Sequence, residues 1–455
     1  MRSCFLKRFG HWRITLLAIV TIVLAAVTSA RAGDQSRFAD NLLGDWGGLR
    51  GDLLRNGIDL TIDYEAESAS NVQGGKKLGV RYTDQLTFGT RLDLDRLLGL
   101  DQAQLQVTIT DRNGRNLSSD LHLDTLQLVQ EVFGRGQTWR ITQLWYHQIY
   151  FGGALDWKAG RLTVGEDFAS FFCEFMNLTF CGAPPGNLVG NYWYNWPVSQ
   201  WAMRLKANLT DFGYAQLGAY EVNPNWLTRR YAFYLWDPPG ATGALIPAEL
   251  GWFPSVGAAQ LPGGYKFGAW YNTSRTPDVV LNAQRKLLGL AGGQPLQRNG
   301  AYGVYVNFIQ QLTEGAPATG RGVNVFLNAS EPAEGLNAFV NATFADRQTA
   351  TLDSQIAVGL VQVGPFASRP ADQVAIAIGR THVNKRVAGA EGLQNAAGLG
   401  PVGVQHSEYV GEIYYKLHAA PGIYLQPNIQ YIVSPGGVSG NANDLILGFK
   451  LVVHL

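Results

Sequence analysis

Apolar and polar side chains alternate at every second position through most of the chain beyond residue 57. In the first such segment, residues 58–66, apolar side chains fall on one face and acidic or hydroxyl side chains on the other. This period of two is that of a β-strand with one apolar and one polar face. Beyond residue 32, no segment has the ~18 uninterrupted apolar residues that a membrane helix needs. If this part of the chain meets a membrane, we expect it to do so with strands.

Seventeen segments show features of a strand. They are residues 58–66, 86–95, 104–110, 139–151, 154–164, 201–209, 213–222, 244–254, 264–273, 300–312, 321–330, 335–345, 354–363, 372–382, 409–418, 423–433 and 445–455. A bacterial barrel with both ends in the periplasm needs an even number of strands. One segment is therefore not a barrel strand, and we suspect the 331–363 stretch. Tight turns are expected at 210–212 and 419–422, and long connections at 165–198, 223–243 and 274–299.

Closing these strands into a ring removes the sheet edges, so that every backbone group is paired within the protein, as hydrocarbon requires. The apolar faces then contact lipid. A ring of about 16 strands is too wide to be filled by side chains, so the polar faces are expected to line an aqueous channel. The alternative is a soluble β-sandwich. It is disfavoured because only 16% of the residues are charged. We predict an all-β, transmembrane antiparallel β-barrel of 16 strands at residues 58–455.

The N-terminus has the pattern of an export signal. Basic residues precede an apolar run at 14–27, and Ala30 and Ala32 supply the small residues that a signal peptidase accepts. Residues 1–32 are therefore predicted to be a signal peptide, with an uncleaved anchor helix as the alternative. Residues 33–57 carry leucines at helical spacing up to Asn56 and Gly57, which predicts a short periplasmic helical segment. The expected location is the bacterial outer membrane.

Charge and motifs exclude several classes of function. The predicted signal peptide contains five of the 36 basic residues and no acid, which leaves 31 basic against 35 acidic residues, a net charge of −4. The broad basic surface of a nucleic-acid-binding protein is thus missing. No nucleophile elbow, P-loop or zinc helix motif occurs, and no cofactor or metal site is expected. A barrel enzyme would need a Ser or Asp paired with a histidine near the rim, and His122 and His406 are the only histidines that offer this in loops. We therefore predict that the chain is not an enzyme.

Two cysteines remain beyond residue 32, Cys173 and Cys181. In an oxidising compartment such a pair favours a disulfide that closes a short loop, over two free thiols. A zinc site is less favoured, because two sulfurs eight positions apart without a nearby histidine do not complete its ligand set.

Several segments in a fixed order make the chain resemble the carbohydrate-selective porins of the OprB type. They are Leu43-Gly44-Asp45-Trp46-Gly47-Gly48-Leu49-Arg50 with Gly57-Ile58, Lys158-Ala159-Gly160-Arg161-Leu162, Cys173 to Cys181-Gly182, Trp193-Tyr194-Asn195-Trp196-Pro197, Pro262-Gly263-Gly264-Tyr265-Lys266-Phe267-Gly268-Ala269-Trp270-Tyr271 and Arg369-Pro370-Ala371-Asp372. The resemblance implies a 16-stranded outer-membrane barrel that passes glucose and other small sugars by passive diffusion, with an inward-folded loop that narrows the lumen. The alternative function is a general or anion-selective diffusion porin.

The resemblance to the porin family implies small sugars as permeants, and the apolar strand faces imply outer-membrane lipid as a partner. The C-terminal strand, residues 445–455, resembles the signal that the outer-membrane assembly machinery reads. Signals of that kind most often end in Phe, whereas this strand ends at Leu455. A homotrimer is expected only because porins of this size are often trimers.

A sugar offers hydroxyl groups and two weakly apolar faces, so a selective pore needs aromatic surface and charged or amide groups. Residues 165–198 contain both, and we predict that they form the constriction loop. The alternative is an outer loop whose aromatic residues lie at the membrane girdle. Arginines in the barrel wall are further candidates, although each is commonly a solvated lumen charge, and the direction of Arg161 is ambiguous. The candidate sugar contacts are Arg91, Arg112, Arg161, Glu166, Asp167, Glu174, Trp193 and Trp196.

Overall fold

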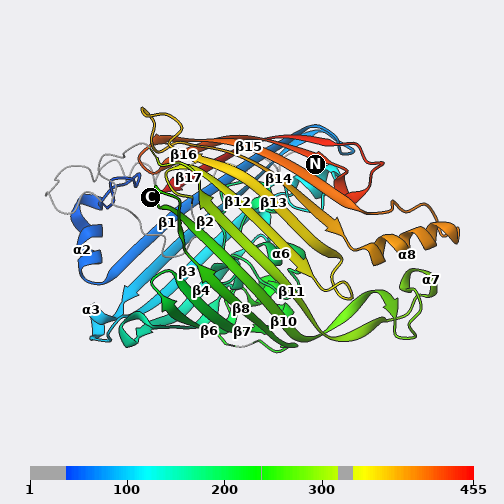
Figure 1. The fold of residues 1–455 in the computed structure, drawn as a ribbon, viewed down its shortest axis with the longest axis horizontal. Helices are drawn as coiled ribbons and strands as arrows, with labels where there is room; N and C mark the ends of the chain where they lie inside the picture. Colours follow the sequence, from blue (N-terminus) through cyan, green and yellow to red (C-terminus); the bar gives the residue numbers. More distant parts are fainter. Residues whose placement is uncertain (1–36, 237, 316–331) are drawn as a thin grey trace, which may run out of the picture.

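The strands close into a single antiparallel barrel. The structure is a computed structural model, and it describes residues 37–236, 238–315 and 332–455. Within these residues sixteen long strands pair in chain order, and β1 (Ile58–Gln73) also pairs with β17 (Asp444–His454), which closes the ring (Figure 1). The predicted 16-stranded β-barrel is therefore confirmed.

The remaining barrel strands follow one another along the chain. They are β2 (Gly79–Asp93), β3 (Ala103–Gly114), β4 (Trp139–Tyr150), β5 (Leu155–Leu162), β6 (Gln200–Thr210), β7 (Gly213–Val222), β8 (Gly243–Trp252), β10 (Leu261–Asn282), β11 (Pro295–Gln311), β12 (Gly335–Ala345), β13 (Leu352–Val363), β14 (Gln373–Val383), β15 (Ser407–Ala420) and β16 (Ile423–Val433). The two-residue strand β9 (Ser255–Val256) pairs only with the start of β10 and lies outside the ring.

The two faces of the strands differ as the alternation predicts. On β14, Ile376 and Ile378 are exposed on the outer surface, whereas the alternate residues Ala375 and Ala377 are buried. On β16 the outward Tyr431 is exposed and the inward Gln430 has an exposed fraction of 0%. Exposed apolar side chains on the outer face are what a barrel presents to lipid. The buried inward amide shows that much of the polar face contacts protein, where the alternation alone predicted water.

Most predicted strands are confirmed, and two expectations are wrong. The suspected 331–363 stretch forms the regular strands β12 and β13, so the suspicion was wrong. The candidate at 321–330 lies outside the described residues. The expected long connection at 274–299 is also wrong, because β10 and β11 continue through most of it. Their extension pairs Thr276 with Arg298, and Asp278 binds the Arg298 guanidinium at 2.6 Å.

The N-terminal segment forms the predicted short helix. A 3₁₀ turn η1 (Trp46–Gly48) leads into α2 (Leu49–Arg55), which ends before Gly57 with its φ of +85°. Arg50 donates to the carbonyl oxygens of Leu455 and Leu60 at 2.7 and 2.8 Å, and thereby ties this segment to the barrel seam. The predicted signal peptide, residues 1–32, lies outside the described residues. None of the described helices is long and apolar enough to cross a membrane.

The other helices are short and lie in the connections. They are α3 (Leu94–Leu98), α4 (Leu117–Leu121), η2 (Glu131–Phe133), η3 (Phe151–Gly153), α5 (Val164–Asp167), η4 (Leu178–Phe180), α6 (Pro184–Leu188), η5 (Pro224–Leu227), η6 (Arg229–Tyr231), α7 (Leu288–Ala291), α8 (Lys385–Ala396) and η7 (Pro435–Gly437). Helices α2 and α3 lie at one end of the barrel, while α7 and α8 project from the other (Figure 1). The tight turns that join β6 to β7 and β15 to β16 belong to the α2 end, which we assign to the periplasm because such barrels have short periplasmic turns.

Candidate functional site

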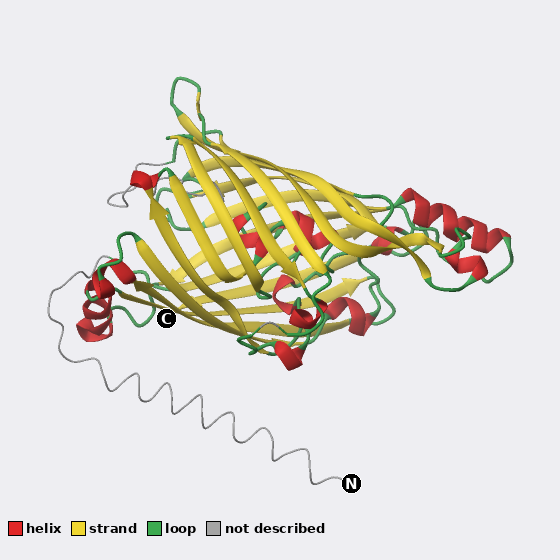
Figure 2. Cartoon of the chain, turned by 90° about the horizontal axis from the view of Figure 1, so that it is seen from below, coloured by secondary structure: helices red, strands yellow, loops and turns green. Residues whose placement is uncertain are grey.

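The segment between β5 and β6 folds into the barrel, as predicted for the constriction loop. Short helices lie within the ring of strands (Figure 2). Phe172, Phe175 and Phe180 of this segment are buried against wall residues, and the Phe175 ring lies 4.9 Å from that of Tyr414 on β15. These contacts bury apolar surface inside the lumen, which is the main favourable contribution to holding such a loop in place. The aromatic rings of the loop therefore serve largely as its core.

A second segment, residues 115–138, also folds into the lumen. Leu117 and Leu121 are buried in the same cluster as the phenylalanines of the first loop. The two segments bond to each other, since Glu131 N–H donates to the Met176 carbonyl oxygen and Leu178 N–H to the Leu128 carbonyl oxygen, both at 2.9 Å. This infolded segment was not predicted from the sequence. Two features of the sequence could have identified it as an infolded segment, namely the lack of two-residue alternation and the closely spaced leucines.

Buried glutamates on the barrel wall hold both segments by their backbone N–H groups. Glu412 on β15 accepts from Met176 and Asn177, both at 2.9 Å. Glu408 accepts from Leu126 at 2.7 Å, and Glu249 on β8 accepts from Ala169 at 2.8 Å. Bonds from N–H groups to a carboxylate are roughly twice as strong as neutral ones. Much of the charge on the inner wall thus positions the loops.

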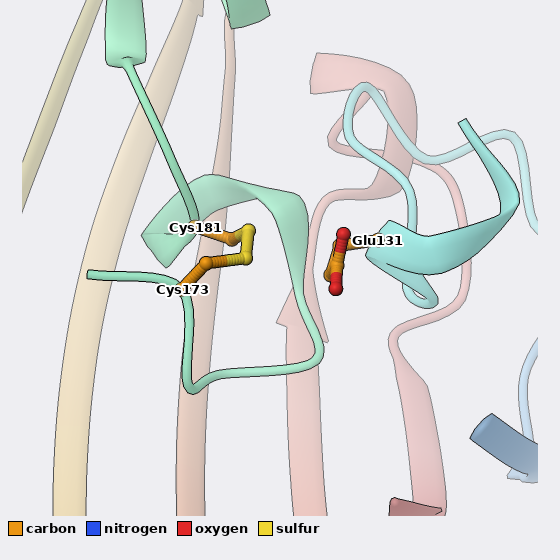
Figure 3. A group of neighbouring side chains, drawn as sticks. All are labelled: Glu131, Cys173 and Cys181. Carbon is orange, nitrogen blue, oxygen red and sulfur yellow. A yellow bond between two sulfur atoms is a disulfide. The ribbon is translucent and has the colours of Figure 1, made fainter. Parts of the chain in front are cut away.

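Cys173 and Cys181 form the predicted disulfide, next to Glu131 (Figure 3). Glu131 lies close enough to both sulfurs for the three to be considered as metal ligands. Because the sulfurs are bonded to each other, neither offers the thiolate that a metal would need. Both cysteines line a cavity on the outer side of the lumen. The bridge therefore closes the loop beside the path of a permeant.

Two cavities follow one another along the lumen. The outer cavity, of about 940 Å³, is bordered by both infolded segments and contains Arg112 and Asp124 in its lining. The inner cavity, of about 370 Å³, includes Arg91 and His454 near the periplasmic end of the barrel. Four residues line both cavities and define what we call the narrow zone: Glu65, Gln85, Glu166 and Trp196.

Hydrogen bonds fix the side chains of the narrow zone. The Gln85 Oε1 atom accepts from Trp196 Nε1 at 2.9 Å and from Arg112 Nε at 2.8 Å. Glu166 accepts from Gln143 at 2.5 Å and from the Thr163 hydroxyl. Burial raises the pKa of Glu166, although Lys158 and these two hydrogen bonds oppose the shift. Trp196 and Glu166 were predicted as candidate contacts, whereas Glu65 and Gln85 were missed because the wall positions that meet the loop are set by the three-dimensional fold.

Two of the predicted arginines also line the lumen. Arg112 is buried in the outer cavity, where it contacts the Glu131 carboxylate at 3.6 Å and donates to the Gly134 carbonyl oxygen at 3.0 Å. Arg91 is exposed in the inner cavity and donates to Gln106 at 3.3 Å. Of the two, Arg91 has the more accessible guanidinium.

Two other candidates are buried away from both cavities. Arg161 donates to the carbonyl oxygens of Tyr234 and Ser199 at 2.8 and 3.0 Å, and its guanidinium stacks 3.7 Å from the Trp226 ring centroid. Trp193 has an exposed fraction of 0% and packs against Trp270. In this structure neither side chain presents surface to a permeant, because each is used to pack the loops against the wall.

Asp167 and Glu174 attach the constriction loop to the wall. Asp167 binds Lys158 at 3.0 Å. Glu174 binds Lys416 at 2.6 Å. Burial alone would raise the pKa of Glu174, but the Lys416 ammonium lowers it below the ordinary value. Both carboxylates are thus engaged by wall lysines, which favours an anchoring role.

The comparisons with known proteins agree with this architecture. Residues 77–455 match the family described as "Carbohydrate-selective porin, OprB family". Porin B of Pseudomonas aeruginosa is 42% identical over 424 residues, which cover 90% of each chain, and the putative porin QuiX of Acinetobacter baylyi is 33% identical over 94% of this chain and 98% of its own. A high-pH structure of Pseudomonas putida OprB superposes with a TM-score of 0.85 at 41% identity, covering 91% of this chain and 98% of that one.

Proposed function

Because the chain belongs to the carbohydrate-selective porins of the OprB family, we propose that permeating sugars are selected at the narrow zone. The protein is an outer-membrane porin through which carbohydrates diffuse passively. What supports the narrow zone as the selecting element is its position, since its four residues border both the outer and the inner cavity. A permeant that moves from one cavity to the other passes these side chains.

Trp196 supplies the aromatic surface of the narrow zone. Its indole N–H is bonded to Gln85, so the ring is held in one orientation. A fixed flat ring beside carboxylate and amide groups matches a sugar, whose apolar face stacks while its hydroxyl groups form hydrogen bonds. Arg112 and Arg91 extend the polar lining into the outer and inner cavities respectively. Arg161, Asp167, Glu174 and Trp193 act as positioning residues in this proposal.

Replacement of Trp196 by alanine tests the proposal. We expect sugar block of single-channel current to weaken by roughly tenfold, since aromatic contacts of this size contribute about 1–1.5 kcal/mol, while salt conductance stays similar or rises. Trp252→Ala is the matched control, because that ring is 49% exposed on the outer face of β8. An unchanged sugar affinity in Trp196→Ala, measured in planar bilayers, places the contact elsewhere.

The relatives of the chain are channel proteins, and we propose that it has no catalytic activity of its own. Hydrolysis of chromogenic ester and peptide substrates by the purified barrel would contradict this.

We also propose that the outer-membrane assembly machinery recognises β17 and that the protein is a homotrimer. Both proposals rest on the class of protein to which the chain belongs. Native mass spectrometry of the detergent-extracted protein distinguishes a trimer from a monomer.

A further inference from the structure

The side-chain amide of Gln85 is held in one orientation by two donors. Its Oε1 atom accepts from Trp196 Nε1 at 2.9 Å and from Arg112 Nε at 2.8 Å. Both of these nitrogens carry a hydrogen and offer no acceptor, so only the oxygen of the amide can satisfy them. A flipped amide would set its N–H groups against those of Trp196 and Arg112. The neighbours of Gln85 therefore determine which end of the amide faces which way.

The other nitrogens of the Arg112 guanidinium are engaged as well. Nη1 donates to the carbonyl oxygens of Gly134 and Glu131 at 3.0 and 3.2 Å, and Nη2 lies 3.6 Å from the Glu131 carboxylate. The exposed fraction of Arg112 is 4%. Arg112 thus acts as a positioning residue for Gln85, which in turn orients the Trp196 ring.

The nitrogen end of the Gln85 amide is directed toward the inner cavity. Its Nε2 atom lies 3.4 Å from the Thr87 hydroxyl, and Thr87 lines the inner cavity, whereas Arg112 lines the outer one. The NH₂ group has two hydrogens, and this long bond uses one of them. Within the described chain Nε2 forms no other hydrogen bond. One N–H of Gln85 therefore remains for a permeant that moves between the cavities.

From this geometry we infer that Gln85 is a specificity-determining residue, which donates a hydrogen bond from Nε2 to a hydroxyl oxygen of the sugar that stacks on Trp196. This inference rests on the proposed function, because it assigns one contact within the same narrow zone. A sugar without a hydroxyl at the contacted position leaves the N–H unpaired, which is unfavourable in a site with little water. The pore should therefore prefer fully hydroxylated pyranoses to deoxy sugars.

The test compares glucose with each of its monodeoxy analogues as blockers of single-channel current, with the full-length purified barrel in planar bilayers. We expect at least one analogue to block about three- to tenfold more weakly than glucose, as the loss of one hydrogen bond predicts. If every analogue blocks as strongly as glucose, no hydroxyl is recognised and the inference about Gln85 is overturned. If glucose itself neither blocks the current nor enters liposomes, the proposed function is contradicted instead.

Gln85→Glu assigns the hydrogen bond to this side chain. The carboxylate still accepts from Trp196 and Arg112, and these donors favour its ionised form, which has no proton to donate. We expect glucose block to weaken about three- to tenfold, and the sensitive deoxy analogue to block this variant as strongly as glucose does. Gln297→Glu adds an equal charge at an exposed position of β11 outside both cavities and should keep the native preference. A native preference for glucose in Gln85→Glu, in a barrel that still runs as a heat-modifiable species on gels, refutes the assignment.

Gln85→Met separates the contact from the positioning of Trp196. Methionine has a similar length but is only a weak acceptor, so it leaves the indole N–H without a good partner. We expect glucose block in Gln85→Met to be roughly threefold weaker than in Gln85→Glu, because the aromatic contact is also weakened. Equal block in the two variants would contradict the orientation of Trp196 by Gln85.

Discussion

Glu412→Gln should loosen the constriction loop without unfolding the barrel. The Glu412 carboxylate is 2% exposed and accepts the N–H groups of Met176 and Asn177, both at 2.9 Å. An amide can accept only one of these bonds well, and its NH₂ group then faces the other donor. An unpaired buried N–H costs about 1–3 kcal/mol, and a bond to a charged group contributes about 1.5–3 kcal/mol. We therefore expect the attached state of the loop to lose about 2–3 kcal/mol.

That loss raises the population of a detached loop roughly 30- to 150-fold. In single-channel recordings it should appear as greater open-channel noise, higher mean salt conductance and weaker glucose block. Glu391→Gln is the matched control. Glu391 on α8 also accepts a backbone N–H, from Gln405 at 2.8 Å, but α8 projects away from the barrel (Figure 1). Identical noise, conductance and glucose block in Glu412→Gln and the native protein would refute the positioning role of the wall glutamates.

Three further variants test other parts of the structure. The double variant Cys173→Ser/Cys181→Ser should fold but show faster hydrogen exchange in the constriction loop. Mass spectrometry of the native protein should find the two cysteines linked, and two alkylatable thiols would contradict the bridge. Trp193→Ala should lower the midpoint of thermal unfolding, since removal of a fully buried Trp costs about 3–5 kcal/mol; an unchanged midpoint with weakened sugar block would instead make it a contact residue. Arg50→Ala should speed hydrogen exchange of the backbone amides around Leu455 at the seam, because the 2.7 Å hydrogen bond from Arg50 to the Leu455 carbonyl oxygen is lost. Equal exchange rates in the variant and the native protein would show that the N-terminal segment does not stabilise the last strand.

The fold was predictable because membrane strands obey a local rule. Residues such as Ile376 and Ile378 meet lipid at every second position, and this period is visible without knowledge of any partner strand. The extension of β10 and β11 was not visible, because it depends on pairing across the hairpin and on the contact between Asp278 and Arg298.

The site was predictable only in part. The constriction loop was recognisable from its cysteines and its density of aromatic residues, which also identified Trp196. The roles of its side chains were not, because composition does not show which rings face the pore and which pack against the wall, as Trp193 does. Glu65 and Gln85 occupy ordinary polar positions in strands β1 and β2, and only the inward fold of two segments places them at the narrow zone.

The most direct test of a sugar porin with a structured narrow zone is conductance and permeation of the purified barrel in lipid. Glucose and short oligosaccharides should reduce the single-channel current in a concentration-dependent manner, and in liposome swelling glucose should enter faster than amino acids of similar size. If sugars neither block the current nor enter faster than such amino acids, the barrel is a general diffusion pore and selection of sugars at the narrow zone is wrong.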